Sequence, residues 1–542
     1  MRTPMKVASL RQVREIEAAA DRSGLSYQQM MLNAGRAACE HLRRRCALNS
    51  GTRIVFLIGK GNNGGDGLVM ANDLAKTTDA VIALYLLAPR AARDENFQAV
   101  AARGIPVTQA AEDPDGRLLR DLVAGADIIV DALLGIGLRL PLRGLAASTL
   151  KTVNDCLRDL AAQDQGAAQT TCPRSPSSRA RPYILAIDCP SGINCDTGEA
   201  DSRAISADST ITFIAGKPGL FTFPAAGHVG ELTVAPIGIP ESLPELDRIQ
   251  ATVVDARFAT ALLPPRPLDG HKGSFGKVMI VAGSRQYIGA IALAGEAAYR
   301  SGAGLVTIAT TAKLIDIVAG NLREPTWLPL DDVDGCIAAG AAETVIARAT
   351  GYNALLLGCG LGRHKSTRSF VRAHVSRAST PPLVIDADGL NSLGELPRWW
   401  ERLPDDSILT PHPGELARLT GKSARAINQD RWAIARECAA KWKVLLVLKG
   451  AHTLIAAPDG RISVIPIKTD ALSTAGTGDV LAGLIAGLRG QGLDAFDSAR
   501  LGAYVHAAAG LIAAESLGSS RSVIAGDVLS ALGRAFSRLE AS

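Results

Sequence analysis

The chain has 542 residues, of which 47% are hydrophobic and 20% are charged, and its formal net charge is +5. This length and this balance predict a soluble globular protein with at least two domains. The chain has no dense Lys/Arg run with interleaved aromatics, no apolar stretch of about 18 residues and no signal-peptide pattern, so we expect no nucleic-acid partner and no membrane association.

The first predicted elements are two helices within residues 10–42, where apolar positions recur at helical spacing and break at Ser23 and Gly24. An apolar strand at residues 53–58 follows, and then a glycine-rich turn at residues 59–67 and a helix over about residues 68–75. The glycine spacing fits a dinucleotide fingerprint, but the Asp66 carboxylate opposes a pyrophosphate there. The turn is better suited to a sugar, an amide or a cation.

Further strands at residues 81–87, 126–130 and 183–187 alternate with helical stretches, which is the βαβ rhythm of a parallel sheet. Two of these strands end in acids, Asp131 and Asp188. Because ligands bind outside the carboxyl ends of parallel strands, these acids can converge with Asn63 and Ser191 on one crevice. The alternative is that each Asp only caps the following helix.

The rest of the first half contains an insertion and two strand-like runs. Residues 163–181 are rich in Gln, Ala, Ser, Pro and Arg, which predicts a surface insertion. The strand-like runs lie within residues 211–219 and 230–240. The following proline-rich stretch predicts a linker at residues 241–270, between a domain of residues 1–240 and a domain of residues 271–542.

The first half resembles the NAD(P)H-hydrate epimerase family over roughly residues 5–240, in residues 59–67, Asp131 with its glycine loop, residues 188–192 and residues 217–219. The resemblance implies a Rossmann-like three-layer sandwich that interconverts the R and S forms of hydrated NADH and NADPH. It implies a potassium ion held by Asn63, Asp131 and Ser191, and proton transfer by Asp188. The residues expected to contact the hydrate are Asn62, Asn63, Gly64, Gly65, Asp66, Gly135, Ile136, Gly137, Leu138, Arg139, Leu140, Pro141 and Asp188.

The second half again alternates strands, turns and helices. Its predicted strands are residues 277–281, 305–309, 354–357, 382–385, 407–409 and 444–448, followed by a short hairpin. The turn sequences differ from those of the first half, so the pattern predicts a second doubly wound domain and not a repeat.

A small-residue loop at residues 473–478 runs into an apolar helix, so its free backbone N–H groups predict an anion site. Together with Lys449, this loop can form a phosphate pocket for a nucleotide. Asp479 either transfers a proton from a hydroxyl beside the phosphate or only caps the helix. His412 lies between two prolines of a rigid turn, where it is either a placed site residue or a packed one.

The second half resembles the ADP- or ATP-dependent NAD(P)H-hydrate dehydratase family over about residues 255–540. The matching blocks are residues 271–273, 386–391, 410–415, 449–453 and 474–483. The resemblance implies a ribokinase-like fold, phosphorylation of the hydrate by ADP or ATP with Mg²⁺, and loss of phosphate, with Asp479 accepting the hydroxyl proton. Residues expected to bind the nucleotide are Lys449, Gly450, Ala451, His452, Thr453, Thr474, Ala475, Gly476, Thr477 and Gly478, and those expected to face the hydrate are Ala290, Gly362, His412 and Asp479.

Taken together, the two halves predict a fused repair enzyme for hydrated NADH and NADPH. The alternative is a ribokinase-like kinase for a small alcohol joined to an N-terminal ligand-binding module. The nine cysteines include no Cys-x-x-Cys pair, which favours reduced thiols and a cytoplasmic location. We also expect a homo-oligomer.

Overall fold

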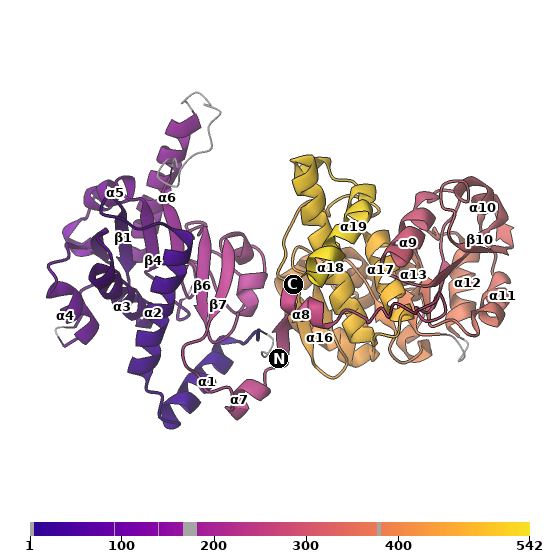
Figure 1. Ribbon diagram of the computed structural model, residues 1–542, viewed down its shortest axis with the longest axis horizontal. Helices are drawn as coiled ribbons and strands as arrows, with labels where there is room; N and C mark the ends of the chain where they lie inside the picture. Colours follow the sequence, from indigo (N-terminus) through magenta and orange to yellow (C-terminus); the bar gives the residue numbers. More distant parts are fainter. Residues whose placement is uncertain (1–4, 92, 139, 166–180, 377–380, 542) are drawn as a thin grey trace. The chain divides into compact units, whose positions relative to one another are not determined.

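The computed structural model describes residues 5–91, 93–138, 140–165, 181–376 and 381–541. They form two compact units, Met5–Ile249 and a second unit that begins at Gln250, and each unit is built around its own sheet (Figure 1). The predicted α/β class with parallel sheets is confirmed in both. Arg139 and residues 166–180 of the expected insertion lie outside the described residues.

The first unit is organised on seven parallel strands in the order β3-β2-β1-β4-β5-β6-β7. The central strands read as continuous Val, Ile and Leu runs because both faces of the sheet are covered. The strand bounds are β1 Arg53–Ile58, β2 Val81–Leu86, β3 Val107–Gln109, β4 Ile128–Ala132, β5 Tyr183–Ile187, β6 Ser209–Phe213 and β7 Glu231–Ala235.

Helices cover the two faces of this sheet in separate layers. Along β1, Ile54 and Phe56 pack into the core shared with α2 and α3, while Val55 and Leu57 pack into the core shared with α5 and α6. This alternation gives a three-layer sandwich. The helix bounds are α1 Leu10–Arg22, α2 Tyr27–Arg45, α3 Asn62–Thr77, α4 Glu95–Ala101, α5 Arg117–Ala124, α6 Gly144–Gln165 and α7 Pro244–Asp247.

Helix α3 begins at Asn62, six residues before the predicted start, because the glycines of the turn are its first turn. A Cβ added at Gly64 would lie 2.0 Å from the carbonyl oxygen of Gly59, and one at Gly67 would lie 2.7 Å from Cβ of Ala132. The glycines therefore bring the start of the helix against the carboxyl ends of β1 and β4. Residues that looked like a loop are a close-packed helix terminus.

The second unit has a ten-stranded sheet in the order β11-β10-β9-β14-β15-β16-β17-β18-β19-β8. Strands β11 to β17 in this order are parallel, and β18 is antiparallel to both of its neighbours. The strand bounds of this sheet are β8 Ala251–Val253, β9 Lys277–Val281, β10 Leu305–Thr311, β11 Thr326–Leu330, β14 Ala354–Leu357, β15 Leu383–Ile385, β16 Ile408–Leu409, β17 Leu445–Leu448, β18 Leu454–Ala456 and β19 Ile462–Val464. A separate antiparallel pair consists of β12 Asp332–Val333 and β13 Cys336–Ile337.

Part of the expected linker at residues 241–270 belongs to the two folded units. Residues up to Ile249 belong to the first unit, and β8 is the edge strand of the second, paired in parallel with β19. The prolines that suggested a linker flank this strand, while Ala251 and Val253 within it are buried. An alternating three-residue strand is too short to stand out in a proline-rich stretch.

Helices α9, α17, α18 and α19 share one large apolar core with the strands of the second unit. The helix bounds are α8 Ala256–Ala261, α9 Gly289–Arg300, α10 Ala312–Val318, α11 Ala341–Ala349, α12 Lys365–Val375, α13 Ala387–Leu393, α14 Pro413–Thr420, α15 Ala424–Gln429, α16 Arg431–Trp442, α17 Thr477–Gly490, α18 Ala495–Leu517 and α19 Ala525–Glu540. Short 3₁₀ turns lie at Ala110–Glu112, Pro218–Phe221, Ala225–Gly227, Trp399–Arg402 and Ser520–Ser522.

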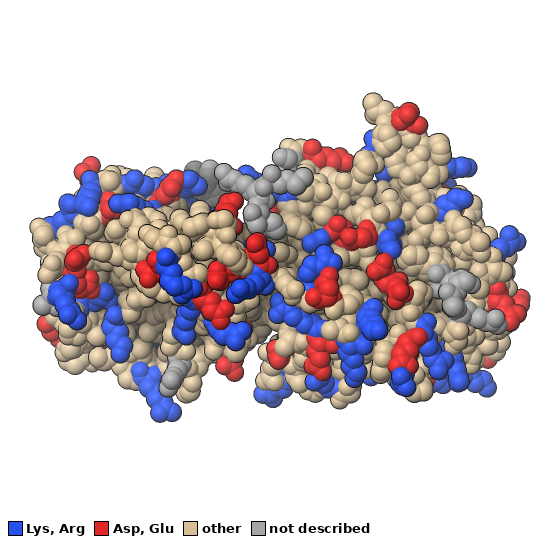
Figure 2. All heavy atoms as spheres, turned by 90° about the horizontal axis from the view of Figure 1, so that it is seen from below, with Lys and Arg blue, Asp and Glu red and all other residues tan. Residues whose placement is uncertain are grey.

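Basic and acidic side chains are interspersed on the face drawn in Figure 2. Among the described residues, no helix has both the length and the apolar character needed to cross a membrane.

Close packing of α17 on α9 depends on Gly483, and we predict that Gly483→Ala destabilises the second unit. The added Cβ would lie 2.2 Å from the carbonyl oxygen of Ala294, so the helices must separate at a cost of about 1–3 kcal/mol. All five tryptophans belong to this unit, so their fluorescence in a urea titration reports its unfolding alone. Gly533→Ala is the control, since its Cβ would meet open space on α19. Equal stability of the two variants would contradict this account of the contact.

Candidate active sites

The first candidate site is a cavity of about 1150 Å³ at the point where the strand order of the first unit reverses, between β1 and β4. In open parallel sheets, such a reversal opens a crevice at the carboxyl ends of the strands. The predicted residues that line the cavity are Asn62, Asn63, Asp66, Gly135, Ile136, Gly137, Leu138 and Asp188.

The other predicted residues of this site lie elsewhere. Gly64 and Gly65 are buried in the packing of α3, where a Cβ at Gly65 would lie 2.6 Å from Sδ of Met31. Leu140 and Pro141 are not among the lining residues, in the described part of the chain.

Asp131 lies at the end of β4, where its side chain is completely buried. Its carboxylate accepts hydrogen bonds from the backbone N–H and the hydroxyl of Ser191, at 2.7 and 2.6 Å, and one from the Leu133 N–H at 3.3 Å. Burial raises the pKa of Asp131 to about 6, and the bonds from Ser191 and Leu133 oppose that rise. These contacts hold Asp131 and Ser191 together, as predicted for two of the cation ligands.

Two features of this cluster fit a bound cation. The described residues include no lysine or arginine in an ion pair with Asp131, so its buried negative charge has no protein counter-charge. Asn63 donates through Nδ2 to the carbonyl of Leu134 at 2.9 Å, whereas its buried Oδ1 has no hydrogen-bond partner among the described residues. Asn63 and Ser191 share the Leu134 carbonyl, and Ser191 bonds to Asp131, so these oxygens form a donor set suited to a hard cation.

Asp188 lies just past β5 in the left-handed backbone region, with φ of 63°. Its Oδ1 accepts from Nζ of Lys217 at 2.6 Å and from the Thr212 hydroxyl at 3.0 Å. Lys217 is itself buried, and its ammonium also donates to Thr212 and, at 3.2 Å, to the carbonyl of Phe213. The ion pair therefore fixes the Asp188 carboxylate at the wall of the cavity.

Two more acids, Glu17 and Asp66, face the same cavity. Burial raises the pKa of Asp66 well above its ordinary value, and the charges of Asp188 and Glu17 add to the rise. Burial and then the charge of Asp188 also raise the pKa of Glu17. The raised pKa values of Asp66 and Glu17 favour the protonated forms of these two carboxyls.

The second candidate site lies at the carboxyl ends of β14, β15 and β17. Lys449 follows β17, and its ammonium donates to Oδ1 of Asp386 at 2.8 Å and lies 3.7 Å from Oε2 of Glu415. Asp386 also accepts from the hydroxyl of Thr410 at 2.7 Å. Burial lowers the pKa of Lys449, but the charges of Asp386 and Glu415 outweigh this effect and raise it. Lys449 therefore stays a buried cation.

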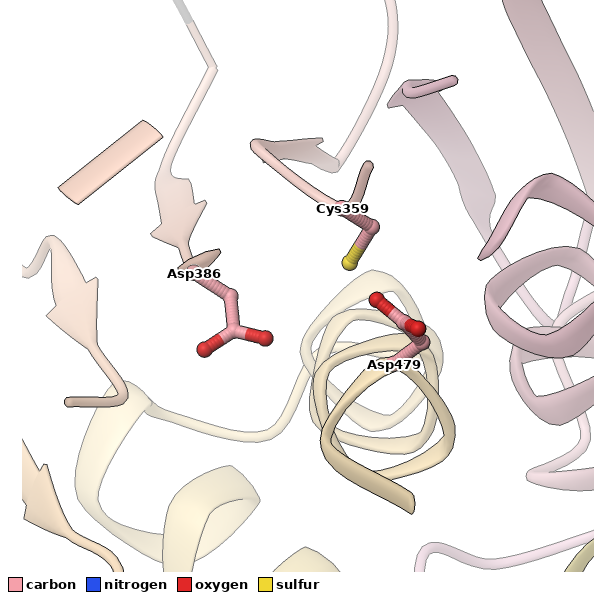
Figure 3. A group of neighbouring side chains, drawn as sticks. All are labelled: Cys359, Asp386 and Asp479. Atoms are coloured by element: carbon pink, nitrogen blue, oxygen red, sulfur yellow. The ribbon is translucent and has the colours of Figure 1, made fainter. Parts of the chain in front are cut away.

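Asp479 lies in the first turn of α17 and faces Asp386 and Cys359 (Figure 3). The Cys359 sulfur and one oxygen from each carboxyl lie within 4.8 Å of one another. Burial raises the pKa of Asp479 to about 7, and the charge of Asp386 adds to the rise. A carboxyl with that pKa can take up and release a proton near neutral pH.

The predicted loop at residues 474–478 leads into α17 with Gly476 at a φ of 93°. The Thr477 hydroxyl bonds to the chain just before it, because it donates to the carbonyls of Leu472 and Thr474, both at 2.9 Å. The Thr477 N–H donates to the carbonyl of Thr474 at 3.4 Å, and among the described residues no side chain caps the start of α17.

The other predicted residues of the second site have defined partners. His412 accepts from the Gly414 N–H at 3.0 Å as the N-cap of α14. Gly362 donates to Asp388 at 2.9 Å. The buried His452 contacts the carbonyl of Ile465 at 3.0 Å, so its ring points away from the loop's outer surface.

Comparison with known proteins matches both halves of the chain. A family described as NAD(P)H-hydrate dehydratase matches residues 278–532, and one described as YjeF-related protein N-terminus matches residues 27–219. The bifunctional NAD(P)H-hydrate repair enzyme Nnr of Moorella thermoacetica is 36% identical over 526 residues, covering 94% of this chain and 92% of that protein. Its namesake from Escherichia coli is 33% identical, covering 95% and 91%. This chain belongs to the family of bifunctional NAD(P)H-hydrate repair enzymes.

Among solved structures, the ADP/ATP-dependent NAD(P)H-hydrate dehydratase of Bacillus subtilis, co-crystallised with ATP/Mg²⁺, is 30% identical. That match covers 53% of this chain and 98% of the other, with a TM-score of 0.46.

Membership of the NAD(P)H-hydrate repair family confirms the predicted fusion of an epimerase half and a nucleotide-dependent dehydratase half. The alternative, a small-alcohol kinase with a ligand-binding module, is not favoured, because the relatives named for hydrate repair match the chain over nearly its whole length.

Several residues of the repair-enzyme sites had no role in the sequence prediction. Lys217 and Asp386 lay inside matching motifs and Cys359 followed a predicted strand, yet their partners are far away in the chain. Arg431 is another: Nη2 donates to the carbonyls of Leu448 and Lys449, at 3.0 and 3.2 Å, and so supports the loop after β17. A Lys or Arg within an apolar pattern is the signal that could have identified Lys217 and Arg431.

We predict that Lys217→Met destabilises the epimerase unit, since it leaves Asp188 without its buried cation. The expected loss is about 3–5 kcal/mol, because removing one partner of a buried ion pair leaves the other charge uncompensated. Hydrogen exchange of peptides from residues 5–249 measures it. Lys6→Met is the matched control: its ammonium donates to one carbonyl, of Ile249 at 3.2 Å, so about 1 kcal/mol is expected. Equal losses in the two variants would contradict a special role for the Lys217 pair.

Proposed function

We propose that Asp188 transfers the proton in the epimerisation of hydrated NADH and NADPH. The hydrated carbon bears a hydroxyl and the ring nitrogen. Asp188 takes the hydroxyl proton while the bond from this carbon to nitrogen breaks, its electron pair goes to nitrogen, and nitrogen is protonated. Reversal of these steps on the other face of the resulting aldehyde closes the ring with opposite configuration. The support is the placement of Asp188 at the cavity wall, held by Lys217 and Thr212.

Asn63, Asp131 and Ser191 would hold a potassium ion beneath this cavity. When bound, the ion supplies a positive charge that offsets the buried Asp131 carboxylate and attracts substrate oxygens. The uncompensated charge of Asp131 and the unused Oδ1 of Asn63 support this proposal. The cation thus has a structural role that can be measured without turnover.

In the dehydratase half, ADP or ATP with Mg²⁺ would bind along the residue 449–453 and 474–478 loops, with the hydrate beside Ala290, Gly362 and His412. Asp479 takes the proton of the hydrate hydroxyl, whose oxygen attacks the terminal phosphorus as the bond to the bridging oxygen breaks. The ring nitrogen then expels the phosphate from carbon, and loss of a proton from the neighbouring carbon restores the dihydronicotinamide ring. Phosphate leaves more readily than hydroxide.

The observation that carries the dehydratase assignment is the environment of Asp479. It lies at the N-terminus of α17, where an anion is stabilised, and its pKa of about 7 suits a base at neutral pH. Because activity requires the ionised form, dehydration is expected to rise as the pH increases through about 7.

We predict that Asp188→Asn and Asp479→Asn abolish different activities of the full chain. Asp479→Asn should slow dehydration of the S hydrate about 10²–10⁴-fold, while R and S hydrates still interconvert. Asp188→Asn should leave dehydration of the S hydrate intact but slow the interconversion by a similar factor. Recovery of dihydronicotinamide absorbance follows the first activity, and chromatography of the hydrates without nucleotide follows the second. Retained dehydration by Asp479→Asn would exclude it as the base; retained interconversion by Asp188→Asn would exclude that residue.

We also predict that potassium stabilises the first unit through Asn63. Saturating KCl, compared with choline chloride at equal ionic strength, should raise its melting temperature by about 4–10 °C. Asn63→Ala should lose most of this shift, because it removes the unused amide oxygen, whereas the neighbouring Asn62→Ala should keep it. Scanning calorimetry gives the answer, and an undiminished shift in Asn63→Ala would contradict the assigned ligand set.

A further inference from the structure

Cys359 lies in a turn that places its sulfur at the centre of the dehydratase site. The turn follows β14, and its flanking residues Gly358 and Gly360 adopt φ of 139° and 61°. A Cβ at Gly358 would lie 1.8 Å from the carbonyl oxygen of Asp386, so only glycine permits this approach. Figure 3 shows the Cys359 sulfur directed into the space shared with the carboxyl groups of Asp386 and Asp479. The thiol is completely buried.

The thiol of Cys359 is a proton donor and not a thiolate. Burial raises its pKa well above the ordinary value, and the charges of Asp479 and Asp386 add to the rise. Its sulfur lies within 4.8 Å of a carboxyl oxygen of Asp479, and the contact of the two side chains lowers the pKa of Asp479. A thiol is a weak donor, but a charged acceptor in a site shielded from water strengthens the bond.

The remaining charged groups near Asp479 act differently. From the β15 and α13 side, Asp386 and Asp388 raise the pKa of Asp479, whereas Lys449, after β17, lowers it. The Lys449 ammonium is itself directed to Asp386 and Glu415. Beyond these, His412 caps α14, where burial lowers its pKa, and His506 on α18 packs behind the α17 terminus, where burial lowers its pKa to about 4. Of these groups, the Lys449 ammonium therefore pairs with Asp386, and the Cys359 thiol faces Asp479.

We propose that Cys359 is a positioning residue for the dehydratase reaction: its S–H donates to one carboxylate oxygen of Asp479, which keeps that group ionised and leaves its other oxygen to accept the hydrate proton. The proposal rests on the assignment of Asp479 as the base. It adds a residue that acts through Asp479 and does not touch the substrate.

The test is the pH profile of kcat/KM for the S hydrate, measured on the full chain with saturating nucleotide. Loss of a donor to the ionised form raises the pKa of Asp479, so Cys359→Ala should move the acidic limb upward by about 0.5–1 pH unit. On that limb, activity should fall about three- to tenfold, while the plateau at high pH and the KM for nucleotide stay within about twofold. Cys438→Ala removes a buried thiol on α16 and should leave the limb in place.

Cys359→Ser is the second variant, and it nearly preserves the side-chain volume. A hydroxyl is a stronger donor than a thiol, so its limb should lie at or below that of the parent protein. This result also keeps the test valid if Cys359→Ala does not fold.

Three outcomes would overturn the proposal: a Cys359→Ala limb that superimposes on the parent's, a loss of activity equal at every pH, or a Cys359→Ser limb shifted upward. The Asp479→Asn variant separates this failure from that of the underlying assignment. If Asp479→Asn retains turnover, the assignment of Asp479 as the base is wrong. If Asp479→Asn is inactive and the Cys359 variants give one of the three outcomes above, only the role assigned to the thiol is wrong.

Discussion

Buried carboxylates at the carboxyl ends of parallel strands are the constraint on which both sites depend. Asp131 in the first unit and Asp386 in the second are buried in this position, and the partly buried Asp188 and Asp479 complete the two sites. Taking a carboxylate out of water is costly unless hydrogen bonds or a counter-charge replace the solvent. In each unit a lysine pairs with one of these acids, and the pKa of another acid, Asp131 or Asp479, is raised.

Glycines at close backbone contacts make this arrangement possible. Gly64 brings the start of α3 to within contact of the backbone at Gly59, and Gly358 does the same for the Cys359 turn against Asp386. Backbone N–H groups and helix dipoles thereby approach the site directly. Glycine in such positions loses conformational entropy on folding, so the helix packing elsewhere, as at Gly483 against α9, has to offset that loss.

Local pattern was enough to predict most strands, the parallel topology and the two crevices. The apolar runs at β1, β4, β14 and β17 are long enough to recognise, and acids at strand ends meet wherever strands are parallel. What the pattern missed depends on distant contacts. Lys217 meets Asp188 from 29 residues away, and Lys449 meets Asp386 from 63. The start of α3 was predicted too late because its glycines suggested a loop. Strand β8 was missed because the prolines around it suggested a linker.

The protein environment, and not the substrate, brings the pKa of the Asp479 carboxyl into the neutral range. Infrared difference spectra between the parent protein and Asp479→Asn, recorded without nucleotide or hydrate, follow the carbonyl band of the protonated acid as the pH is raised. We expect this band to disappear with a midpoint at about pH 7. A midpoint near the ordinary value for aspartic acid, at about pH 4, would contradict it.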